Sequence, residues 1–200
     1  MALDSLLPLG AFAMASTLSP GGATTLATAS GAHFGYRRSL PLIVGITFAL
    51  AAMAAVAAAG LASLLLTAPA LTLAMKVAGA AYLLWLAWKI ATSGSPHASA
   101  NPRTPMSFLG GIWLQSQNPK GWAMTLGAAA SFAALSRSPF VLAAWLGLAF
   151  GVAAAVSLTA WCLAGSVLAK ALKTDRQWRV LNGLLAALLV LSILPMLWPR

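Results

Sequence analysis

Acidic residues are almost absent from this sequence. Asp4 and Asp175 are its only carboxylates, both fall near the ends of apolar stretches, and there is no glutamate among the 200 residues. Hydrolysis by paired carboxylates needs two acids in one site, and a relay of buried acids needs them at membrane depth. The sequence therefore excludes both kinds of machinery within one subunit.

Cysteine and histidine are equally scarce. Cys162 is the only cysteine, which excludes a thiol–disulfide electron relay, because that chemistry needs a pair. We place His33 and His97 in loops, so neither a metal site nor a serine–histidine nucleophile is expected in the apolar core. No nucleotide-binding loop of the form G-x-x-x-x-G-K-S/T occurs. We expect a protein that is not an enzyme, carries no metal or cofactor, and does not use ATP directly.

Charge is rare and apolar residues are abundant. Seven per cent of the residues are charged, 60% are hydrophobic, and the mean hydropathy is +0.88. A soluble domain needs more polar surface than this. Six segments are long enough to cross a bilayer, which takes about 20 apolar residues per helix; they are 5–30, 39–66, 69–91, 107–134, 139–169 and 178–198. The composition predicts an all-α integral membrane protein with six transmembrane helices.

The net charge of +10 follows the predicted loops. The 1–2, 3–4 and 5–6 loops would share one side of the membrane and carry eight basic residues: Arg37, Arg38, Lys89, Arg103, Lys170, Lys173, Arg176 and Arg179. The opposite side would carry only Arg137 and Arg200. Cytoplasmic loops are enriched in Lys and Arg, so this distribution predicts those loops inside and both termini outside. It also argues against nucleic acid as the partner.

Two helix-breaking motifs lie ninety-nine residues apart. Ser19-Pro20-Gly21-Gly22 interrupts the first apolar segment, and Asn118-Pro119-Lys120-Gly121 interrupts the fourth. An Arg-Ser pair begins eighteen residues after each proline, at Arg38 and Arg137. The pattern predicts a single transmembrane domain of two halves, 1–91 and 107–200, joined by a cytoplasmic linker at 92–106. Three helices per half would make them inverted repeats, with helices 1 and 4 interrupted.

Matched interruptions in the two halves are typical of the binding site of a secondary transporter. Half-helix N-termini favour anions, and Lys120 could pair with a substrate carboxylate or release a proton. The predicted substrate-binding residues are Ser19, Pro20, Gly21, Gly22, Thr24, Gln115, Asn118, Pro119 and Lys120. The alternatives are that both prolines are simple kinks and that Lys120 snorkels to the interface, as we expect for Lys76.

Several of these motifs resemble the lysine-exporter superfamily, in particular its homoserine/threonine-type branch. They are Ser19-Pro20-Gly21, Gly35-Tyr36-Arg37-Arg38-Ser39, Gly79 to Leu83 with Trp88-Lys89, and Asn118-Pro119-Lys120. The stretch from Gly79 to Thr92 is most similar to the cysteine/O-acetylserine exporters. The resemblance implies a bacterial inner-membrane protein that exports amino acids, driven by the proton motive force. The sequence departs from the family in having Gly22, Ala23 and Thr24 where the first motif usually continues with a second proline and asparagine.

We therefore expect a secondary transporter that exports small amino acids or their derivatives by proton antiport, with the lipid bilayer as its surroundings. Two alternatives remain open. A membrane assembly or scaffold subunit would have a stable protein partner and no solute flux, and a passive channel would have a flux indifferent to the proton gradient. The Gly- and Ala-rich helix faces fit a homo-oligomer as well as internal packing.

Overall fold

The structure is a computed structural model, and it describes residues 3–61, 77, 80–81, 84–92 and 104–191. All regular elements within these residues are helical. They are α1 (Leu3–Leu18), α2 (Gly22–Phe34), α3 (Tyr36–Val56), α6 (Phe108–Ser116), α7 (Pro119–Ser131), α8 (Pro139–Ala171) and α9 (Asp175–Leu191). A π-helical turn at Ala57–Leu61 follows α3, and a 3-10 turn at Ala133–Leu135 follows α7.

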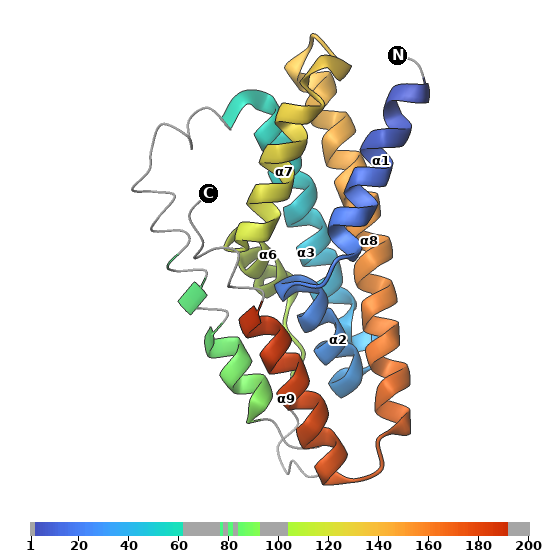
Figure 1. Ribbon diagram of the computed structural model, residues 1–200, viewed down its shortest axis with the longest axis vertical. Helices are drawn as coiled ribbons and strands as arrows, with labels where there is room; N and C mark the ends of the chain where they lie inside the picture. The colour runs from blue at the N-terminus through green and yellow to red at the C-terminus, as the bar shows by residue number, and fades with distance from the viewer. Residues whose placement is uncertain (1–2, 62–76, 78–79, 82–83, 93–103, 192–200) are drawn as a thin grey trace.

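The longest helix, α8, organises the bundle. Its 33 residues give it a length of about 50 Å, and α1, α2 and α3 pack along it (Figure 1). Glycines bring α2 and α8 together, because a Cβ added at Gly31 would collide with the carbonyl of Cys162, and one added at Gly165 with the carbonyl of Thr28. Backbones that approach this closely without a side chain between them are typical of helix packing in membranes.

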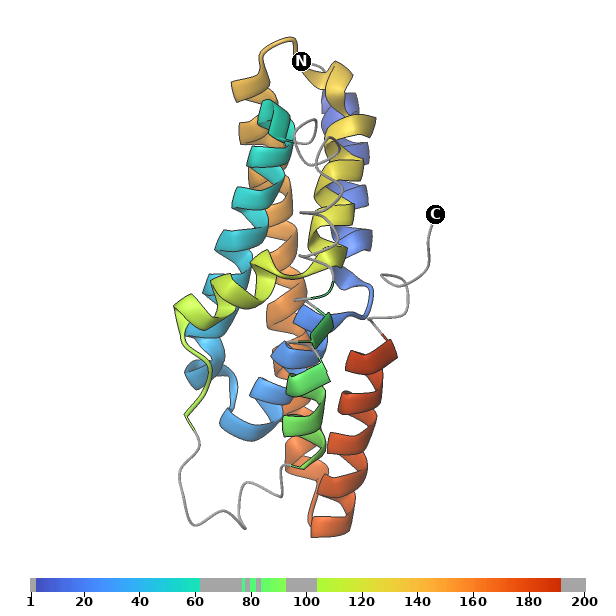
Figure 2. The ribbon, with the colours of Figure 1, turned by 90° about the vertical axis from the view of Figure 1, so that its left-hand side faces the viewer.

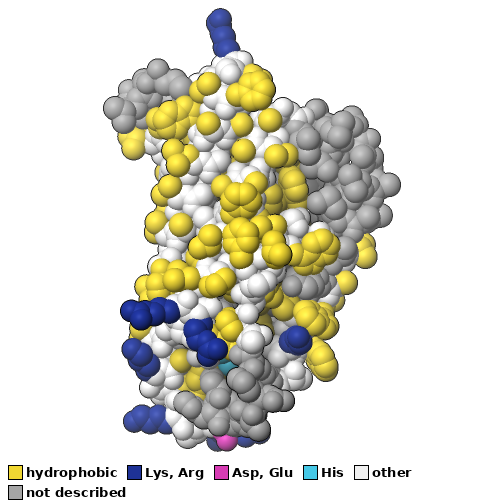
Figure 3. Space-filling view, turned by 180° about the vertical axis from the view of Figure 1, so that it is seen from behind, with side chains coloured by type: hydrophobic (Ala, Val, Ile, Leu, Met, Phe, Trp, Pro, Cys, Tyr) yellow, Lys and Arg dark blue, Asp and Glu magenta, His cyan; other side chains and the backbone are white. Residues whose placement is uncertain are grey.

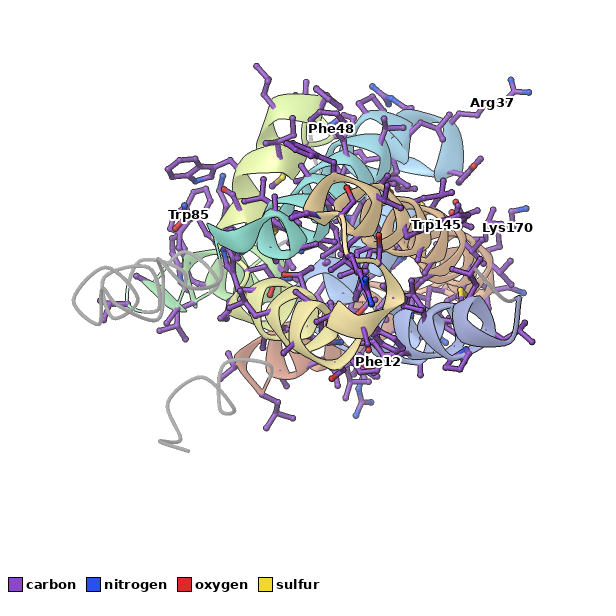
Figure 4. All side chains as sticks on the ribbon, turned by 90° about the horizontal axis from the view of Figure 1, so that it is seen from above. Phe12, Arg37, Phe48, Trp85, Trp145 and Lys170 are labelled. Atoms are coloured by element: carbon purple, nitrogen blue, oxygen red, sulfur yellow. The ribbon has the colours of Figure 1, made fainter. Side chains whose placement is uncertain are left out.

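The core of the bundle and its outer surface are both apolar. Phe150 and Leu146 of α8 are fully buried, and the ring of Phe12 from α1 stands edge-on to that of Phe150, with the centroids 6.4 Å apart. Facing outward, Phe140 is 83% exposed and Phe48 is 59% exposed; Figure 4 shows Phe48 at the periphery of the bundle. An apolar exterior over an apolar core is unfavourable in water and suits a lipid environment.

Two of the described helices are long and apolar enough to cross a membrane, Tyr36–Gly60 and Pro139–Ala171. The shorter apolar helix Leu6–Leu18 belongs to the predicted first segment, which the structure divides into α1 and α2. The predicted fourth segment is likewise divided into α6 and α7, and Figure 2 shows α6 lying across the bundle while α7 runs along it. Of the predicted 69–91 segment, residues 77, 80–81 and 84–91 are described, and all of them are helical. The six-span count and the inverted repeat stay predictions.

Parts of the predicted organisation fall outside the described residues. They are most of the linker 92–106, the side chains of Lys76 and His97, and the end of the last segment beyond 191. The placement of His33 in a loop was wrong. It lies in the last turn of α2, which is followed by the C-cap Gly35 with φ 76°, and its Nε2 is 3.0 Å from Oδ1 of the buried Asn182 in α9.

Basic side chains gather at one end of the molecule. Figure 3 shows the face of the molecule that is turned away from the viewer in Figure 1. Lys and Arg side chains are clustered at its lower end, below a broad band without charge. Arg37 begins α3 and Lys170 ends the antiparallel α8, so these two share that end, and Figure 4 shows both pointing away from the helices on the same side. The basic residues that the sequence assigns to one set of loops thus lie at one end of the structure. That this end faces the cytoplasm stays a prediction.

Candidate functional site

The first interruption is a true break in the helix. α1 ends at Leu18, α2 begins at Gly22, and Gly21 between them is fully extended, with φ −179° and ψ −175°. The side-chain hydroxyl of Thr24 accepts a hydrogen bond from the Gly21 N–H at 2.8 Å and donates one to the Gly21 carbonyl at 2.9 Å. Pro20 therefore does not act as a simple kink in a continuous helix.

Side chains from α8 satisfy two carbonyls that the end of α1 leaves without helical partners. Ser157 Oγ donates to the Thr17 carbonyl at 2.7 Å, and Trp161 Nε1 donates to the Leu18 carbonyl at 3.2 Å. Ser157 and Trp161 are four residues apart and so lie on one face of α8. Non-helical backbone at membrane depth survives only where protein or water pairs it, and α8 supplies this pairing.

The second interruption lies between α6 and α7. Asn118 caps α7, because its Oδ1 accepts a hydrogen bond from the Lys120 N–H at 3.1 Å, and Pro119 occupies the first turn, where no N–H is needed. Asn118 Nδ2 donates to Gln115 Oε1 at 3.2 Å, and Gln115 itself is 1% exposed. A Cβ at Gly121 would collide with the Gln115 amide nitrogen, so the glycine makes room for this buried side chain.

Lys120 joins the two interruptions, although they are a hundred residues apart in the sequence. Its Nζ donates to the Ser19 carbonyl at 2.6 Å, to Ser19 Oγ at 2.8 Å and to the Pro20 carbonyl at 3.2 Å. A Cβ at Gly21 would lie 3.0 Å from Lys120 Cδ, so the glycine leaves space for the lysine stem. The α1 C-terminus carries the negative end of the helix dipole, which favours a cation at this position.

A small cavity lies between the two interruptions. Its volume is about 30 Å³, which is room for a water molecule. Six residues of the two break regions line it on its polar side: Gly21, Gly22, Thr24, Gln115, Asn118 and Lys120. Ser16, Thr17 and Ala23 also line it, and the rest of the wall is apolar: Ile46, Leu50, Met124, Ala154 and Leu158. In this conformation the space between the two interruptions is much smaller than ligand pockets usually are.

The structure gathers most of the predicted site residues. Besides the six that line the cavity, Ser19 is held by Lys120 but is exposed, as is Pro20, while the half-buried Pro119 does not contribute to the lining. Their role in binding stays a prediction. Sequence reasoning missed Ser157 and Trp161, and the available signal was two residues with hydrogen-bond donors one turn apart in an otherwise apolar segment.

The chain is similar to known proteins over almost its whole length. The LysE type translocator family matches residues 14–193. The cysteine/O-acetylserine efflux protein of Klebsiella pneumoniae subsp. pneumoniae is 33% identical over 181 residues, and that of Escherichia coli K12 is 29% identical over 187. The protein of the same description from Salmonella typhimurium LT2 is 28% identical over 179 residues. These alignments cover 90% of each chain.

No solved structure is found to match the chain. The family match nevertheless spans both interruptions and every residue of the cavity, and it agrees with the resemblance that the sequence motifs carry. The chain therefore belongs to the LysE type translocator family.

Proposed function

We propose that this protein exports small amino acids or their derivatives from the cytoplasm across the bacterial inner membrane, in exchange for protons. The observation that carries the proposal is the meeting of two helix breaks at one small cavity inside an apolar bundle, where polar side chains of both breaks are among the lining residues and Lys120 of the second break is bonded to the first. Unwound backbone and half-helix ends facing one site are the usual means by which secondary transporters bind small zwitterions. Membership in a translocator family supports the same conclusion.

The substrate class follows from the relatives and from the cavity. The relatives compared above are described as cysteine/O-acetylserine efflux proteins. In this chain the amide groups of Gln115 and Asn118 offer both donors and acceptors, and the apolar part of the lining includes Ile46, Leu50 and Leu158. A small polar head with a short, weakly polar side chain suits such surroundings, so we propose cysteine-like and O-acetylserine-like substrates.

The proposed orientation in the membrane follows from the charge distribution. The basic end of the bundle would face the cytoplasm, which puts both termini in the periplasm. The cavity is too small for an amino acid in this conformation, so the halves of the bundle must separate to admit one. Rocking about the two breaks would then expose the site alternately to the two sides of the membrane.

Efflux from proteoliposomes tests the proposal. Vesicles containing the purified protein and loaded with radiolabelled O-acetyl-L-serine or L-cysteine should release it faster when a proton gradient drives protons in the opposite direction, and a protonophore should remove the acceleration. A flux that ignores the gradient would indicate a channel. The absence of flux, together with a stable co-purifying protein, would indicate a scaffold subunit.

The site is tested by a matched pair of substitutions. Gln115→Ala removes a 1%-exposed amide from the cavity wall, and we expect transport to fall at least about tenfold. Gln117→Ala changes a half-buried amide two residues away that does not line the cavity, and we expect transport close to wild type. Equal effects of the two substitutions would contradict the assignment of the site.

A further inference from the structure

Four consecutive carbonyls, from Thr17 at the end of α1 to Pro20 in the break, have two kinds of partner. Those of Thr17 and Leu18 accept from Ser157 and Trp161, neutral side chains that keep their protons under all physiological conditions. The next two carbonyls, of Ser19 and Pro20, both accept from the Lys120 ammonium. A lysine can lose a proton, and a neutral amine is attracted to these oxygens less strongly than an ammonium. The hydrogen bonds to the Ser19 and Pro20 carbonyls can therefore be given up, unlike those to Thr17 and Leu18.

The geometry around Lys120 Nζ is that of a complete binding site for a primary ammonium. An ammonium on a carbon stem has three N–H groups, and three oxygens surround this one at 2.6, 2.8 and 3.2 Å. All three are neutral oxygens of Ser19 and Pro20, and the negative end of the α1 dipole adds to their attraction for a cation. These oxygens recognise an ammonium group, and they do not require that it belong to a lysine.

An amino acid carries such a group. We propose that the oxygens of Ser19 and Pro20 form an ammonium site shared by Lys120 and the substrate, in which the substrate α-ammonium replaces that of Lys120. This inference rests on the export function proposed above and deepens it. The substrate must then have a free primary ammonium, and Lys120 is the group that carries the exchanged proton.

The exchange balances charges and protons. When substrate binds from the cytoplasm, Lys120 gives one proton to the cytoplasm and leaves as a neutral amine, while the substrate ammonium takes the three oxygens. On the periplasmic side a proton from outside restores the Lys120 ammonium, which reoccupies the oxygens and expels the substrate. One proton thus moves inward for each amino acid that moves outward, and no other reactant is needed.

Substrate binding is coupled to proton release because the site holds one ammonium at a time, either that of Lys120 or that of the substrate. Two cations side by side at this half-buried position repel each other, and without an ammonium the three oxygens of Ser19 and Pro20 lose their hydrogen bonds to the protein. Lys120 is also the bond between the α1–α2 break and α7, so its departure would free the two breaks to separate. Occupancy of the ammonium site and opening of the cavity would then be linked.

Among the residues around this site, Lys120 is the side chain that can gain or lose a proton. It is the titratable side chain among the residues that line the cavity, which come from α1, α2, α3, α6, α7 and α8. The charged residues and the other ionisable residues on these helices lie mostly at their ends: Asp4 in the first turn of α1, His33 in the last turn of α2, Tyr36, Arg37 and Arg38 at the start of α3, and Lys170 in the last turn of α8. Cys162 lies within α8, where it is fully buried and does not line the cavity.

Calorimetry on the wild-type protein tests the inference directly. L-cysteine is titrated into the detergent-solubilised protein in two buffers with different enthalpies of ionisation, which counts the protons released on binding. We expect about one proton per bound ligand, and an affinity that rises up to about tenfold per pH unit between about pH 6 and about pH 7.5. 3-Mercaptopropionate, which lacks the ammonium group, should neither bind nor release a proton. Binding of L-cysteine without proton release, or equal binding of both compounds, would overturn the inference.

Two substitutions and one control refine the test. Lys120→Met keeps the length of the side chain without a proton to exchange, so binding should persist but release no proton and lose its pH dependence. Lys120→Arg places a cation there that cannot be deprotonated, so binding should be lost. Lys89→Met, which alters an exposed lysine stacked 4.3 Å above the Trp85 ring, should behave as wild type.

The outcomes separate this inference from the export proposal. If the Lys120→Met protein does not fold, the number of protons that the wild-type protein releases per bound L-cysteine tests the shared ammonium site by itself. A Lys120→Met protein that still releases a proton would refute the shared site while leaving export intact. A wild-type protein that binds and transports no amino acid would refute both.

Discussion

Replacement of Gly31 by alanine should destabilise the bundle by forcing α2 away from α8. A Cβ at this position would lie 2.8 Å from the Cys162 carbonyl carbon and 2.9 Å from Cys162 Sγ, where ordinary contacts begin at 3.4 Å, and it would overlap the Cys162 carbonyl oxygen. Because most of the obstacle is backbone, it cannot turn aside as a flexible side chain can. The helices must separate by more than half an ångström.

The expected cost follows from two opposing effects. Overpacking a well-packed contact costs about 1–3 kcal/mol, and the rigid backbone at Cys162 places this site at the upper end. Alanine recovers about 1 kcal/mol of helix propensity relative to glycine. The net loss is about 2 kcal/mol, which for a chain of 200 residues corresponds to a Tm lower by roughly 4 to 8 °C.

The single buried cysteine provides the assay. Cys162 is fully buried and is the only cysteine in the chain, so a dye that becomes fluorescent on reaction with thiols reports the opening of this contact during a thermal ramp. Gly10→Ala is the matched control, because a Cβ at Gly10 meets nothing within 4 Å, and it should raise Tm slightly through helix propensity. If Gly31→Ala and Gly10→Ala melted at the same temperature, the close contact of α2 with α8 would be refuted.

Three further substitutions act on the breaks themselves. Ser157→Ala leaves the buried Thr17 carbonyl without its 2.7 Å partner and should lower stability by about 1 kcal/mol in the same melt, whereas an unchanged Tm would mean that water replaces the hydroxyl. Asn118→Ala removes the cap of α7 and should cost about 1 kcal/mol and most of the transport rate; wild-type efflux would contradict its place in the site. Gly121→Ala would displace the Gln115 amide and should reduce efflux at least about tenfold, and an unaffected rate would show that Gln115 is not required in its present position.

The sequence predicted the features that depend on local chemistry. Both interruptions were expected, because proline next to Ser or Asn with glycine close by disfavours a continuous helix, and both are present. Their convergence on one cavity was predicted from the repeat, and Lys120, Gln115 and Asn118 do meet there. The resemblance to the lysine-exporter superfamily is confirmed by the family match, as is the prediction that the chain is a translocator and not an enzyme.

The sequence could not predict the hydrogen bonds between residues far apart in the chain, because these bonds depend on how the helices are aligned against one another. The partners of the α1 carbonyls are Ser157 and Trp161, about 140 residues away, and their alignment is fixed by the packing of glycines between α2 and α8. The sequence suggested that Lys120 pairs with a substrate carboxylate or releases a proton, and it did not predict the bonds that Lys120 makes here with the neutral oxygens of Ser19 and Pro20. Side-chain spacing along one helix carries no information on such contacts.

The most direct test of the central claim is whether substrate occupies the space between the two breaks. Met124→Cys, introduced with Cys162→Ala, puts a thiol on the wall of the cavity, and Met14→Cys in the same background puts one at another half-buried methionine that does not line it. We predict that saturating O-acetyl-L-serine slows the reaction of a thiol reagent at position 124 and leaves the reaction at position 14 unchanged. Equal labelling at position 124 with and without the amino acid would contradict the claim that the breaks enclose the transport site.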